Sequence, residues 1–126
     1  MRAPVVHVEV VGPDPGGLRR FYAALFDWDA PAGSPVAPEV SVTTEYAFNE
    51  PGDGAASVPT GIGGGDGFRA GALFYVGVPD VEQALAHAER LGGRRLLGPV
   101  LNPAGGVVVG HLADPAGNRI GVAAPA

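Results

Sequence analysis

Three histidines are the side chains of this sequence best suited to proton transfer or metal binding near neutral pH. His7 and Glu9 stand two residues apart in the apolar run VVHVEVV, so an extended backbone would place both on one face. A histidine beside a carboxylate can relay a proton or supply two metal donors. His111 follows a later valine run and is a weaker candidate, because the sequence does not determine which face of the strand its side chain lies on. His87 lies off the apolar stripe of its predicted helix, and we expect it to be exposed.

The first of these residues belongs to a strand that leads into a helix. Residues 5–11 are rich in β-branched side chains and predict a strand. Asp14 is a suitable helix N-cap and Pro15 suits the first helical position. The spacing of the next apolar residues predicts an amphipathic helix whose buried face is formed by Leu18, Phe21, Tyr22, Leu25 and Phe26.

The segment from Trp28 to Gly67 is rich in glycine, proline and serine and has weaker patterns. Within it we expect Val40–Phe48 and Thr60–Gly63 to be extended. The glycine run 61–65 is not a phosphate-binding loop, because no Lys-Ser/Thr pair and no helix pattern follow it. We expect these glycines to let the backbone bend or to leave space for a bulky ligand.

The second half has clearer signals. Residues 72–78 predict a strand, and Asp80 is the N-cap of a helix that Gly92 and Gly93 end. The buried stripe of this helix is expected to be Val81, Ala84, Leu85, Ala88 and Leu91. Three further strands are predicted at Arg94–Leu97, Val107–Leu112 and Arg119–Val122, the last after the turn Asp114-Pro115-Ala116-Gly117-Asn118.

The two halves repeat one unit. Pro79-Asp80 stands 66 residues after Pro13-Asp14, and this register sets His7 opposite Leu73. Each half is predicted to be β-α-β-β-β, and a small sheet with one helix cannot close a core alone. We therefore expect one α+β domain over residues 1–126, built from module one (1–65) and module two (68–126).

The composition excludes several classes of function. The chain has 126 residues, 46% of them hydrophobic, which is enough for one domain with a core. It has no cysteine, so disulfides and thiolate chemistry are excluded. The net charge is −5 without any basic stripe, so nucleic acid is not an expected partner. No signal-peptide pattern or membrane-length apolar run is present, and we expect a cytoplasmic protein without membrane contact.

Several motifs together indicate a family. In the first half they are His7-Val8-Glu9-Val10, Pro13-Asp14, Leu18-Arg19-Arg20-Phe21-Tyr22 and Leu25-Phe26-Asp27-Trp28. In the second half they are Phe74-Tyr75-Val76-Gly77-Val78-Pro79-Asp80-Val81, Leu91-Gly92-Gly93 and Asp114-Pro115-Ala116-Gly117-Asn118-Arg119-Ile120-Gly121. This pattern resembles the vicinal oxygen chelate superfamily, which includes glyoxalase I, bleomycin-resistance proteins, extradiol dioxygenases and methylmalonyl-CoA epimerase. The resemblance implies two βαβββ modules that form a cup-shaped mixed sheet with the helices outside.

The resemblance also implies where a metal would bind. Metal-dependent members place ligands on the first and last strand of each module, facing into the cup. His7 stands at the first such position, but Leu73 and Gly121 stand at two others, and Thr60–Gly64 contains no acid. Three or more donors are needed for a stable divalent site. We therefore expect no metal and no cofactor, unless His111 or Glu9 is recruited.

Strand alternation assigns side chains to the two faces of the sheet. We expect the cup side to carry His7, Glu9, Leu73, Tyr75, Gly77, Arg119 and Gly121, with Gly77 and Gly121 widening it. We expect the core side to carry Val6, Val8, Val10, Phe74, Val76, Val78, Ile120 and Val122. Trp28, Tyr46 and Phe48 come from the part of module one expected at the cup mouth, where they either pack in the core or form a stacking platform.

The sequence allows two roles for each of the polar or aromatic candidates on the predicted first strands. His7 is either a hydrogen-bonding group of the pocket or a structural residue satisfied by its neighbours. Glu9 either pairs with His7 or is a carboxylate at the cup rim facing water, and the second is favoured. Tyr75 is either an aromatic wall for a planar ligand or an ordinary packing residue. The ligand-binding candidates are His7, Glu9, Trp28, Tyr46, Phe48, Leu73, Tyr75, His111, Arg119 and Gly121.

These observations favour a metal-independent small-molecule binding protein. The resemblance to bleomycin-resistance proteins implies an apolar or aromatic ligand such as an antibiotic. The alternatives are a metal-free lyase, isomerase or cyclase with His7 as base and Glu9 or Tyr75 assisting, and, less favoured, a metal-dependent glyoxalase or dioxygenase. From the resemblance and from exposed strand edges we also expect a homodimer.

Overall fold

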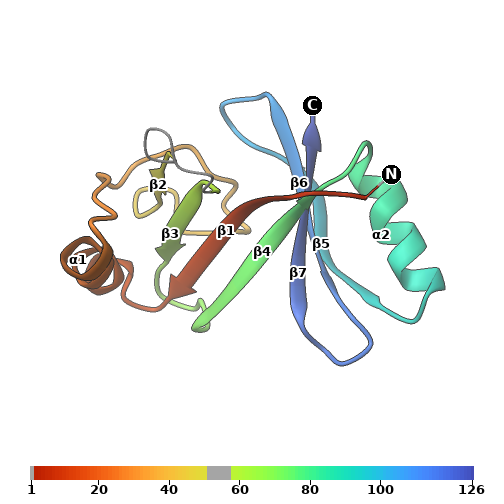
Figure 1. Ribbon diagram of the computed structural model, residues 1–126, viewed down its shortest axis with the longest axis horizontal. Coiled ribbons are helices and arrows are strands. Elements are labelled where there is room, and N and C mark those ends of the chain that lie inside the picture. The colour runs from red at the N-terminus through yellow and green to blue at the C-terminus, as the bar shows by residue number, and fades with distance from the viewer. Residues whose placement is uncertain (1, 51–57) are drawn as a thin grey trace. The chain divides into compact units, whose positions relative to one another are not determined.

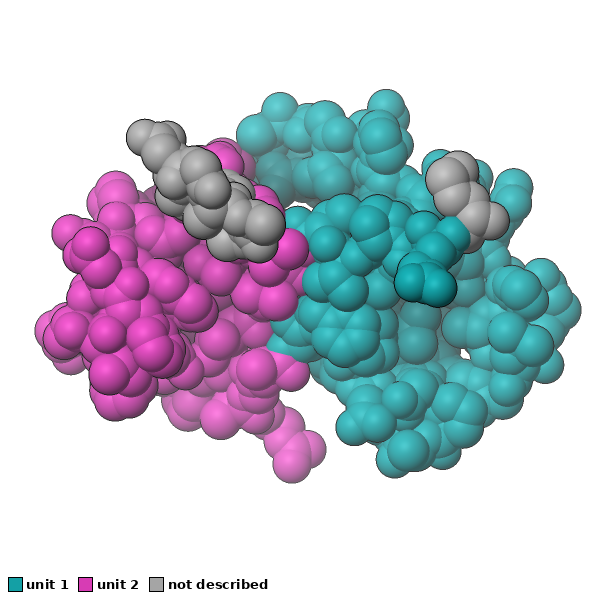
Figure 2. All heavy atoms as spheres, in the orientation of Figure 1, with its two compact units in different colours: residues 1–6, 73–126 teal, residues 7–72 magenta. Residues whose placement is uncertain are grey.

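The computed structural model of the protein describes residues 2–50 and 58–126 (Figure 1). These residues contain seven strands and two helices, so the fold class is α+β, as predicted. They form two compact units, coloured separately in Figure 2. The N-terminal unit is residues 7–72, and the C-terminal unit is residues 73–126 with the N-terminal residues up to Val6. The residues before His7, at the start of the first strand, group with the second half of the chain.

The N-terminal unit has one helix and a small mixed sheet. Its elements are β1 (Val5–Gly12), α1 (Pro15–Phe26), β2 (Ala47–Asn49) and β3 (Thr60–Gly64). β3 is the middle strand, pairing parallel with β1 and antiparallel with β2. Because β3 lies between β1 and β2, a side chain that packs over β3 can contact residues of both neighbouring strands.

Helix α1 begins as the sequence predicted. The Asp14 carboxylate accepts a hydrogen bond from the backbone N–H of Gly17 at 3.1 Å, and Pro15 occupies the start of the helix. The helix ends at Asp27, which has a left-handed backbone with φ of 60°. Its N–H donates to the carbonyls of Ala23 and Tyr22, a C-cap arrangement that Gly or Asn more often provides.

The segment between α1 and β3 differs from its prediction. Of the predicted strand Val40–Phe48, only its last two residues are extended, and the rest forms turns. Ser41 is fully buried, and its hydroxyl accepts a hydrogen bond from the N–H of Gly64 at 2.9 Å. The N–H of Val42 donates to the carbonyl of Gly64 at 2.9 Å. Turns therefore satisfy this end of β3 where a strand was expected, and in the described residues two strands rather than three follow α1.

The C-terminal unit contains the complete repeat unit. Its elements are β4 (Gly71–Gly77), α2 (Val81–Arg90), β5 (Arg94–Leu101), β6 (Val107–Ala113) and β7 (Arg119–Pro125). The strand order is β4-β7-β6-β5, with β4 and β7 parallel and the other pairs antiparallel. The three strands predicted after the helix are all present, and each extends beyond its predicted end.

Helix α2 covers one face of this sheet. The Asp80 carboxylate accepts a hydrogen bond from the N–H of Gln83 at 2.9 Å, which confirms the predicted N-cap. The core beneath the helix is formed by the buried residues Val81, Leu85, Val122 and Ala124. Since Val122 lies on the helix side of β7, its neighbours Gly121 and Ala123 face the opposite side of the sheet.

The turn before β7 is held by one carboxylate. Asp114 accepts hydrogen bonds from the N–H groups of Ala116 and Asn118 and from the Asn118 side chain, each at 2.9 Å. These hydrogen bonds lower the pKa of the Asp114 carboxyl below its ordinary value, and the bond from the Asn118 side chain has the largest effect. The turn sets the start of β7, and so the register of Arg119 and Gly121 against β6.

The repeat predicted from the sequence is present in the strand pairing. In each unit the first and last strands pair in parallel: β1 with β3, and β4 with β7. Glu9 lies opposite Gly61, and Tyr75, the residue equivalent to Glu9 in the repeat, lies opposite Gly121. Each unit therefore has a glycine on its last strand beside the second polar position of its first strand.

Several apolar residues expected in the core are exposed. Phe21 and Leu25 are each 57% exposed and Leu91 is 68% exposed. The apolar stripe of α1 covers more of the helix circumference than a single sheet face can bury, so its outer edge stays open. Leu91 is the C-cap residue of α2, after the last helical turn. The other exposed residues from the predicted core faces are Val6, Phe26 and Phe74.

Within the described ranges, no helix is both long and apolar enough to cross a membrane.

Candidate functional site

A hydrogen-bonded network in the N-terminal unit joins two of the predicted polar candidates through a tyrosine. The Tyr46 hydroxyl donates to Oε1 of Glu9 at 3.0 Å and lies 3.1 Å from Nε2 of His7. A hydroxyl has one hydrogen, so when Tyr46 donates to the ionised Glu9 it must accept from His7. We therefore assign the Nε2 proton of His7 to this bond. His7 Nε2 and Glu9 Oε1 are also 3.7 Å apart.

Burial within this network decreases from Glu9 to His7. Glu9 is 2% exposed, Tyr46 is also buried, and the His7 side chain is 16% exposed. The favoured expectation that Glu9 faces water is wrong, because a tyrosine from the segment between the helix and β3 covers it. A buried carboxylate is costly unless donors satisfy it, and Tyr46 supplies one. His7 is therefore the member of the network that a dissolved molecule can reach.

Two glycines on β3 make room for the tyrosine. A Cβ on Gly61 would collide with the Tyr46 hydroxyl, and a Cβ on Gly63 would lie 2.7 Å from Cδ1 of the same ring. Both glycines lie on one face of β3, and the Tyr46 ring lies against that face. The expectation that this glycine run leaves space for a bulky ligand is corrected here, since a side chain of the protein fills the space above Gly61 and Gly63.

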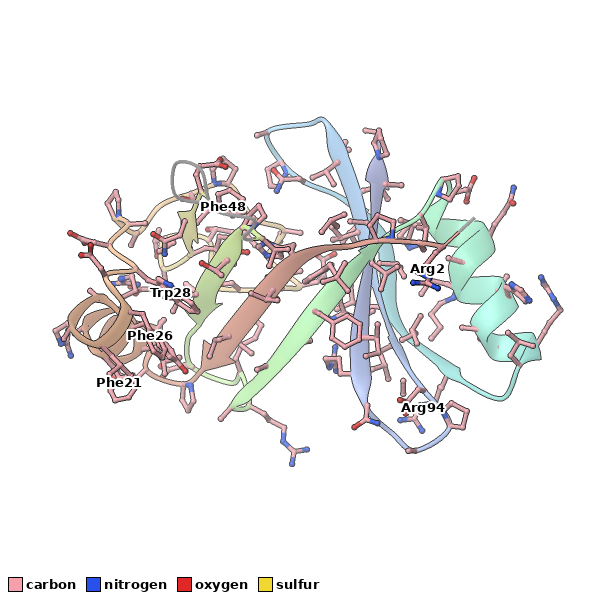
Figure 3. The ribbon with its side chains drawn as sticks, in the orientation of Figure 1. Arg2, Phe21, Phe26, Trp28, Phe48 and Arg94 are labelled. Atoms are coloured by element: carbon pink, nitrogen blue, oxygen red, sulfur yellow. The ribbon has the colours of Figure 1, made fainter. Side chains whose placement is uncertain are left out.

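An aromatic ring from β2 completes this network. Phe48, labelled in Figure 3, lies opposite Gly61 in the strand register. Its ring stacks on the His7 imidazole, with ring centroids 5.5 Å apart and planes 19° apart. Tyr46 thus holds one nitrogen of the imidazole while Phe48 supports its face. We call His7, Glu9, Tyr46 and Phe48 the N-terminal network.

A second network lies in the C-terminal unit. Nη1 of Arg119 lies 2.8 Å from Nδ1 of His111, and Nε2 of His111 lies 2.6 Å from the Tyr75 hydroxyl. A guanidinium can only donate, so Nδ1 must accept and the imidazole is neutral. Its proton is then on Nε2 and is donated to Tyr75. We call Tyr75, His111 and Arg119 the C-terminal network.

A glycine again allows this arrangement. Tyr75, Gly121 and His111 lie directly side by side on β4, β7 and β6. A Cβ on Gly121 would lie 2.5 Å from Cε2 of Tyr75, so the tyrosine ring can cross β7 to His111 only above a residue without a side chain. Tyr75 and His111 are both buried. The expectation that Gly121 widens a pocket is corrected, because Tyr75 occupies that volume.

The remaining predicted residues lie apart from these bonds. Leu73 is buried on β4, two residues before Tyr75. The ring of Trp28 stacks on Tyr22 at 5.4 Å and contacts Phe26 at 5.2 Å, both from α1. The structure thus brings Tyr46 and Phe48 to His7 but places Trp28 in a cluster on the helix. The binding roles of all these residues stay predictions.

A groove elsewhere in the C-terminal unit contains none of the predicted site residues. It has a volume of about 550 Å³ and is lined mainly by apolar residues of the N-terminal segment, the end of β4 and the end of β7. Gly77, expected to widen the cup, lines this groove, and a Cβ there would lie 3.0 Å from Val6.

The sequence singled out Gly61, Gly63 and Gly121, but it did not reveal that tyrosine rings pack over them, nor the role of Ser41. Gly61 and Gly63 alternate along β3, so one face of that strand carries no side chains. Such a bare face on a paired strand indicates that a bulky group packs across it. That signal was visible, but the identity of the group was not, because Tyr46 lies on a turn segment with no periodic pattern.

Replacing Tyr46 by Phe tests the N-terminal network. The change keeps the ring but removes the hydroxyl shared by His7 and Glu9, and we expect the free energy of unfolding to fall by about 1–2 kcal/mol. Chemical denaturation measures this. Tyr22→Phe is the matched control, since within the described residues the Tyr22 ring packs against Phe21 and Trp28 and its hydroxyl makes no hydrogen bond. Equal losses in the two variants would contradict the network.

Comparisons with known proteins define the class. A family model described as a glyoxalase-like domain matches residues 7–123. A methylmalonyl-CoA epimerase variant from Streptomyces coelicolor, solved in complex with 2-nitronate-propionyl-CoA, has a similar structure at 17% identity, with a TM-score of 0.68 over 100% of this chain and 96% of that one. A glyoxalase/bleomycin resistance protein/dioxygenase superfamily member from Vibrio splendidus 12B01 is similar at 15% identity, with a TM-score of 0.59 over 98% of this chain and 99% of that one.

The fold is therefore that of the glyoxalase/bleomycin-resistance proteins, within the vicinal oxygen chelate superfamily. The chain belongs to the glyoxalase-like domain family. A hypothetical protein from Bacillus halodurans C-125 is also similar, with a TM-score of 0.68 at 14% identity over 98% of this chain and 95% of that one. A search of curated proteins found no significant match.

The residues present do not fit the divalent metal that this superfamily implies. In residues 2–50 and 58–126, no three histidine, aspartate or glutamate side chains gather into a group able to hold an ion. His111 already receives a guanidinium at 2.8 Å, and that positive charge opposes a second cation nearby. Leu73 and Gly121, at the positions implied for ligands, offer no donor atoms.

Proposed function

We propose that this member of the glyoxalase-like family is a metal-independent small-molecule binding protein whose ligand is aromatic or largely apolar, such as an antibiotic. The observation that carries the proposal is the His7 imidazole, which Tyr46 holds by hydrogen bonding and Phe48 supports by stacking while its side chain stays 16% exposed. A ring held in this way loses little conformational freedom when a planar molecule binds against it.

The other members of the N-terminal network support binding rather than cation chemistry. Tyr46 and Glu9 are buried and bonded to one another, so they orient His7 and are not presented to solvent. Phe48 is half-buried and adds apolar surface beside the imidazole. A partly exposed aromatic pair with one polar edge is typical of sites that combine stacking with one or two hydrogen bonds.

Ligand binding by two ring variants tests the proposal. A panel of planar aromatic antibiotics is screened by thermal shift, and each compound that binds is measured by isothermal titration calorimetry. We expect His7→Ala and Phe48→Ala each to weaken affinity by about 3- to 10-fold, the size of a lost aromatic contact. His87→Ala, on the exposed side of α2, is the control and should bind as the unchanged protein does.

Two outcomes would overturn the binding proposal. One is unchanged affinity in both ring variants, since the ligand would then lie elsewhere. The other is binding that disappears with EDTA and returns with a divalent ion, because the donor set described above would then be incomplete.

A second candidate is a metal-free enzyme with His7 as general base, as in a lyase, isomerase or cyclase. The observation that favours it is the chain His7–Tyr46–Glu9, in which a buried carboxylate can offset the charge of a protonated imidazole. Methylmalonyl-CoA is a reasonable first probe, because it has an acidic C–H beside a carbonyl, and the exchange of that hydrogen for deuterium is visible by NMR. Exchange catalysed by the unchanged protein and reduced about 100-fold in His7→Ala would replace the binding proposal.

A further inference from the structure

The groove at the end of the sheet in the C-terminal unit has the size of a small-molecule site. Its volume is about 550 Å³, within the range that such sites occupy. Most of its wall comes from the N-terminal segment before His7, the turn after β4 and the last residues of β7. Each of these stretches contributes a proline, Pro4, Pro79 and Pro125, and we call the site the proline groove. It shares no residue with the N-terminal network.

Hydrogen bonds within the wall fix the shape of the proline groove. The N–H of Gly77 donates to the carbonyl of Pro4 at 2.8 Å, which holds the N-terminal segment against the end of β4 (Figure 1). The segment comes this close because Gly77 has no side chain: a Cβ there would lie 3.0 Å from Val6 and 3.6 Å from Pro4. The N–H of Val78 donates to the carbonyl of Ala123 at 2.9 Å. A wall fixed in this way loses little freedom when a molecule binds to it.

The chemistry of the wall favours an aliphatic chain. Apart from the three prolines and Arg2, the described lining residues are alanine, valine and glycine, so a planar molecule finds no ring on which to stack. Proline has no N–H, and Gly77 and Val78 already donate theirs within the wall. An added peptide strand would need such donors, whereas an alkyl chain needs none.

One cation lies at this apolar groove. Among the described lining residues, Arg2 is the single charged side chain (Figure 3). It is exposed and makes no ion pair with any residue that the structure describes. A neighbouring depression on α2 contains both Asp80 and Arg90, so its acid and base offset each other. Since a guanidinium binds a carboxylate through two parallel hydrogen bonds, Arg2 favours an anionic head group beside the apolar wall.

We propose that the proline groove binds a free aliphatic carboxylate, with the alkyl chain along the apolar wall and the carboxylate on Arg2. This is a second class of ligand, because the N-terminal network offers rings for stacking and contains no arginine. Each CH₂ group that leaves water strengthens binding, so affinity should rise about 2- to 4-fold per carbon until the groove is filled.

Three ten-carbon probes separate the contribution of the chain from that of the head group. Decanoate, decanol and decylamine are titrated by calorimetry, each below the concentration at which it aggregates. We expect decanoate to bind about 3- to 10-fold more tightly than decanol, the size of a partly exposed charge pair, and decylamine to bind more weakly than either. Hexanoate and octanoate should bind more weakly than decanoate, in the order of chain length.

Substitutions in the proline groove test its two parts. Arg2→Gln should remove the preference for decanoate over decanol and leave the affinity for decanol unchanged, while Arg2→Lys should keep most of the preference. Arg94→Gln is the matched control, because Arg94 is another exposed arginine of the C-terminal unit that does not line the groove. Ala123→Leu adds bulk inside the groove and should weaken both decanoate and decanol about 10-fold, as the loss of about two buried CH₂ groups would. Circular dichroism establishes that each variant is folded.

Several results would overturn the proposal. Equal affinities for decanoate and decanol would remove the role of Arg2, as would equal losses in Arg2→Gln and Arg94→Gln. Unchanged binding in a folded Ala123→Leu protein would place the chain elsewhere. Binding to phosphatidylcholine vesicles without binding to free decanoate would assign the groove to a membrane surface. Self-association that Ala123→Leu abolishes and decanoate does not affect would assign it to a second copy of the chain.

Discussion

Replacing Leu85 by Ala is expected to lower the free energy of unfolding by about 2–5 kcal/mol. Leu85 is 0% exposed and lies at the centre of the core between α2 and the sheet, with Val81, Val122 and Ala124 around it. Truncation would remove buried methyl groups and leave a cavity. The close fit over Gly110, where a Cβ would lie 2.9 Å from Leu85, indicates how closely the helix lies on β6.

The control for this variant is another leucine near the same helix. Leu91 is 68% exposed, so Leu91→Ala should change the free energy of unfolding by less than about 0.5 kcal/mol. Urea denaturation followed by circular dichroism compares the two variants. A loss for Leu91→Ala as large as that for Leu85→Ala would show that the sequence-based stripe, rather than the observed burial, describes the protein.

Replacing Gly121 by Ala is the second large effect, with an expected loss of about 2–3 kcal/mol in the free energy of unfolding. The new Cβ would be forced against the buried Tyr75 ring, and displacing that ring would break its hydrogen bond to His111. Gly71→Ala is the matched control in the same sheet, since a Cβ there meets nothing within 4 Å. It should change stability by less than about 0.5 kcal/mol.

A double substitution separates this clash from a general intolerance of alanine in β7. In a Tyr75→Leu background the ring is absent, so the further cost of Gly121→Ala should fall to less than half its value in the unchanged protein. Equal costs in the two backgrounds would mean that Tyr75 is not the obstacle, and the account of the C-terminal network would then be wrong.

The tyrosine-over-glycine arrangement changes how the family resemblance applies to this chain. In the C-terminal unit Gly121 stands where the resemblance implies an acidic metal ligand, and in the N-terminal unit Gly61 stands at the corresponding place opposite Glu9. Tyr46 or Tyr75 covers each glycine and bonds a histidine. The positions that could carry metal ligands instead allow a tyrosine and a histidine to meet.

Local signals of the sequence determined the helix starts, the repeat and most strands. Asp14 and Asp80 cap their helices as predicted because a cap depends only on residues within one turn. The side of the sheet on which Tyr75, Gly121 and Val122 lie was also predictable from the sequence, since alternation along a strand is a local property. These features needed no knowledge of what packs against them.

Tertiary structure alone decided how the polar candidates are used. Tyr46 reaches Glu9 and His7 across 37 and 39 residues of chain, from a turn whose sequence has no periodicity. The burial of Glu9 follows from that contact, so no pattern around Glu9 could have predicted it. The sequence likewise did not determine the face of β6 on which His111 lies, and only the pairing of β6 with β7 places it beside Gly121. Contacts between distant segments depend on packing over the whole unit, and that is why the sequence proposed the residues while the fold determined their partners.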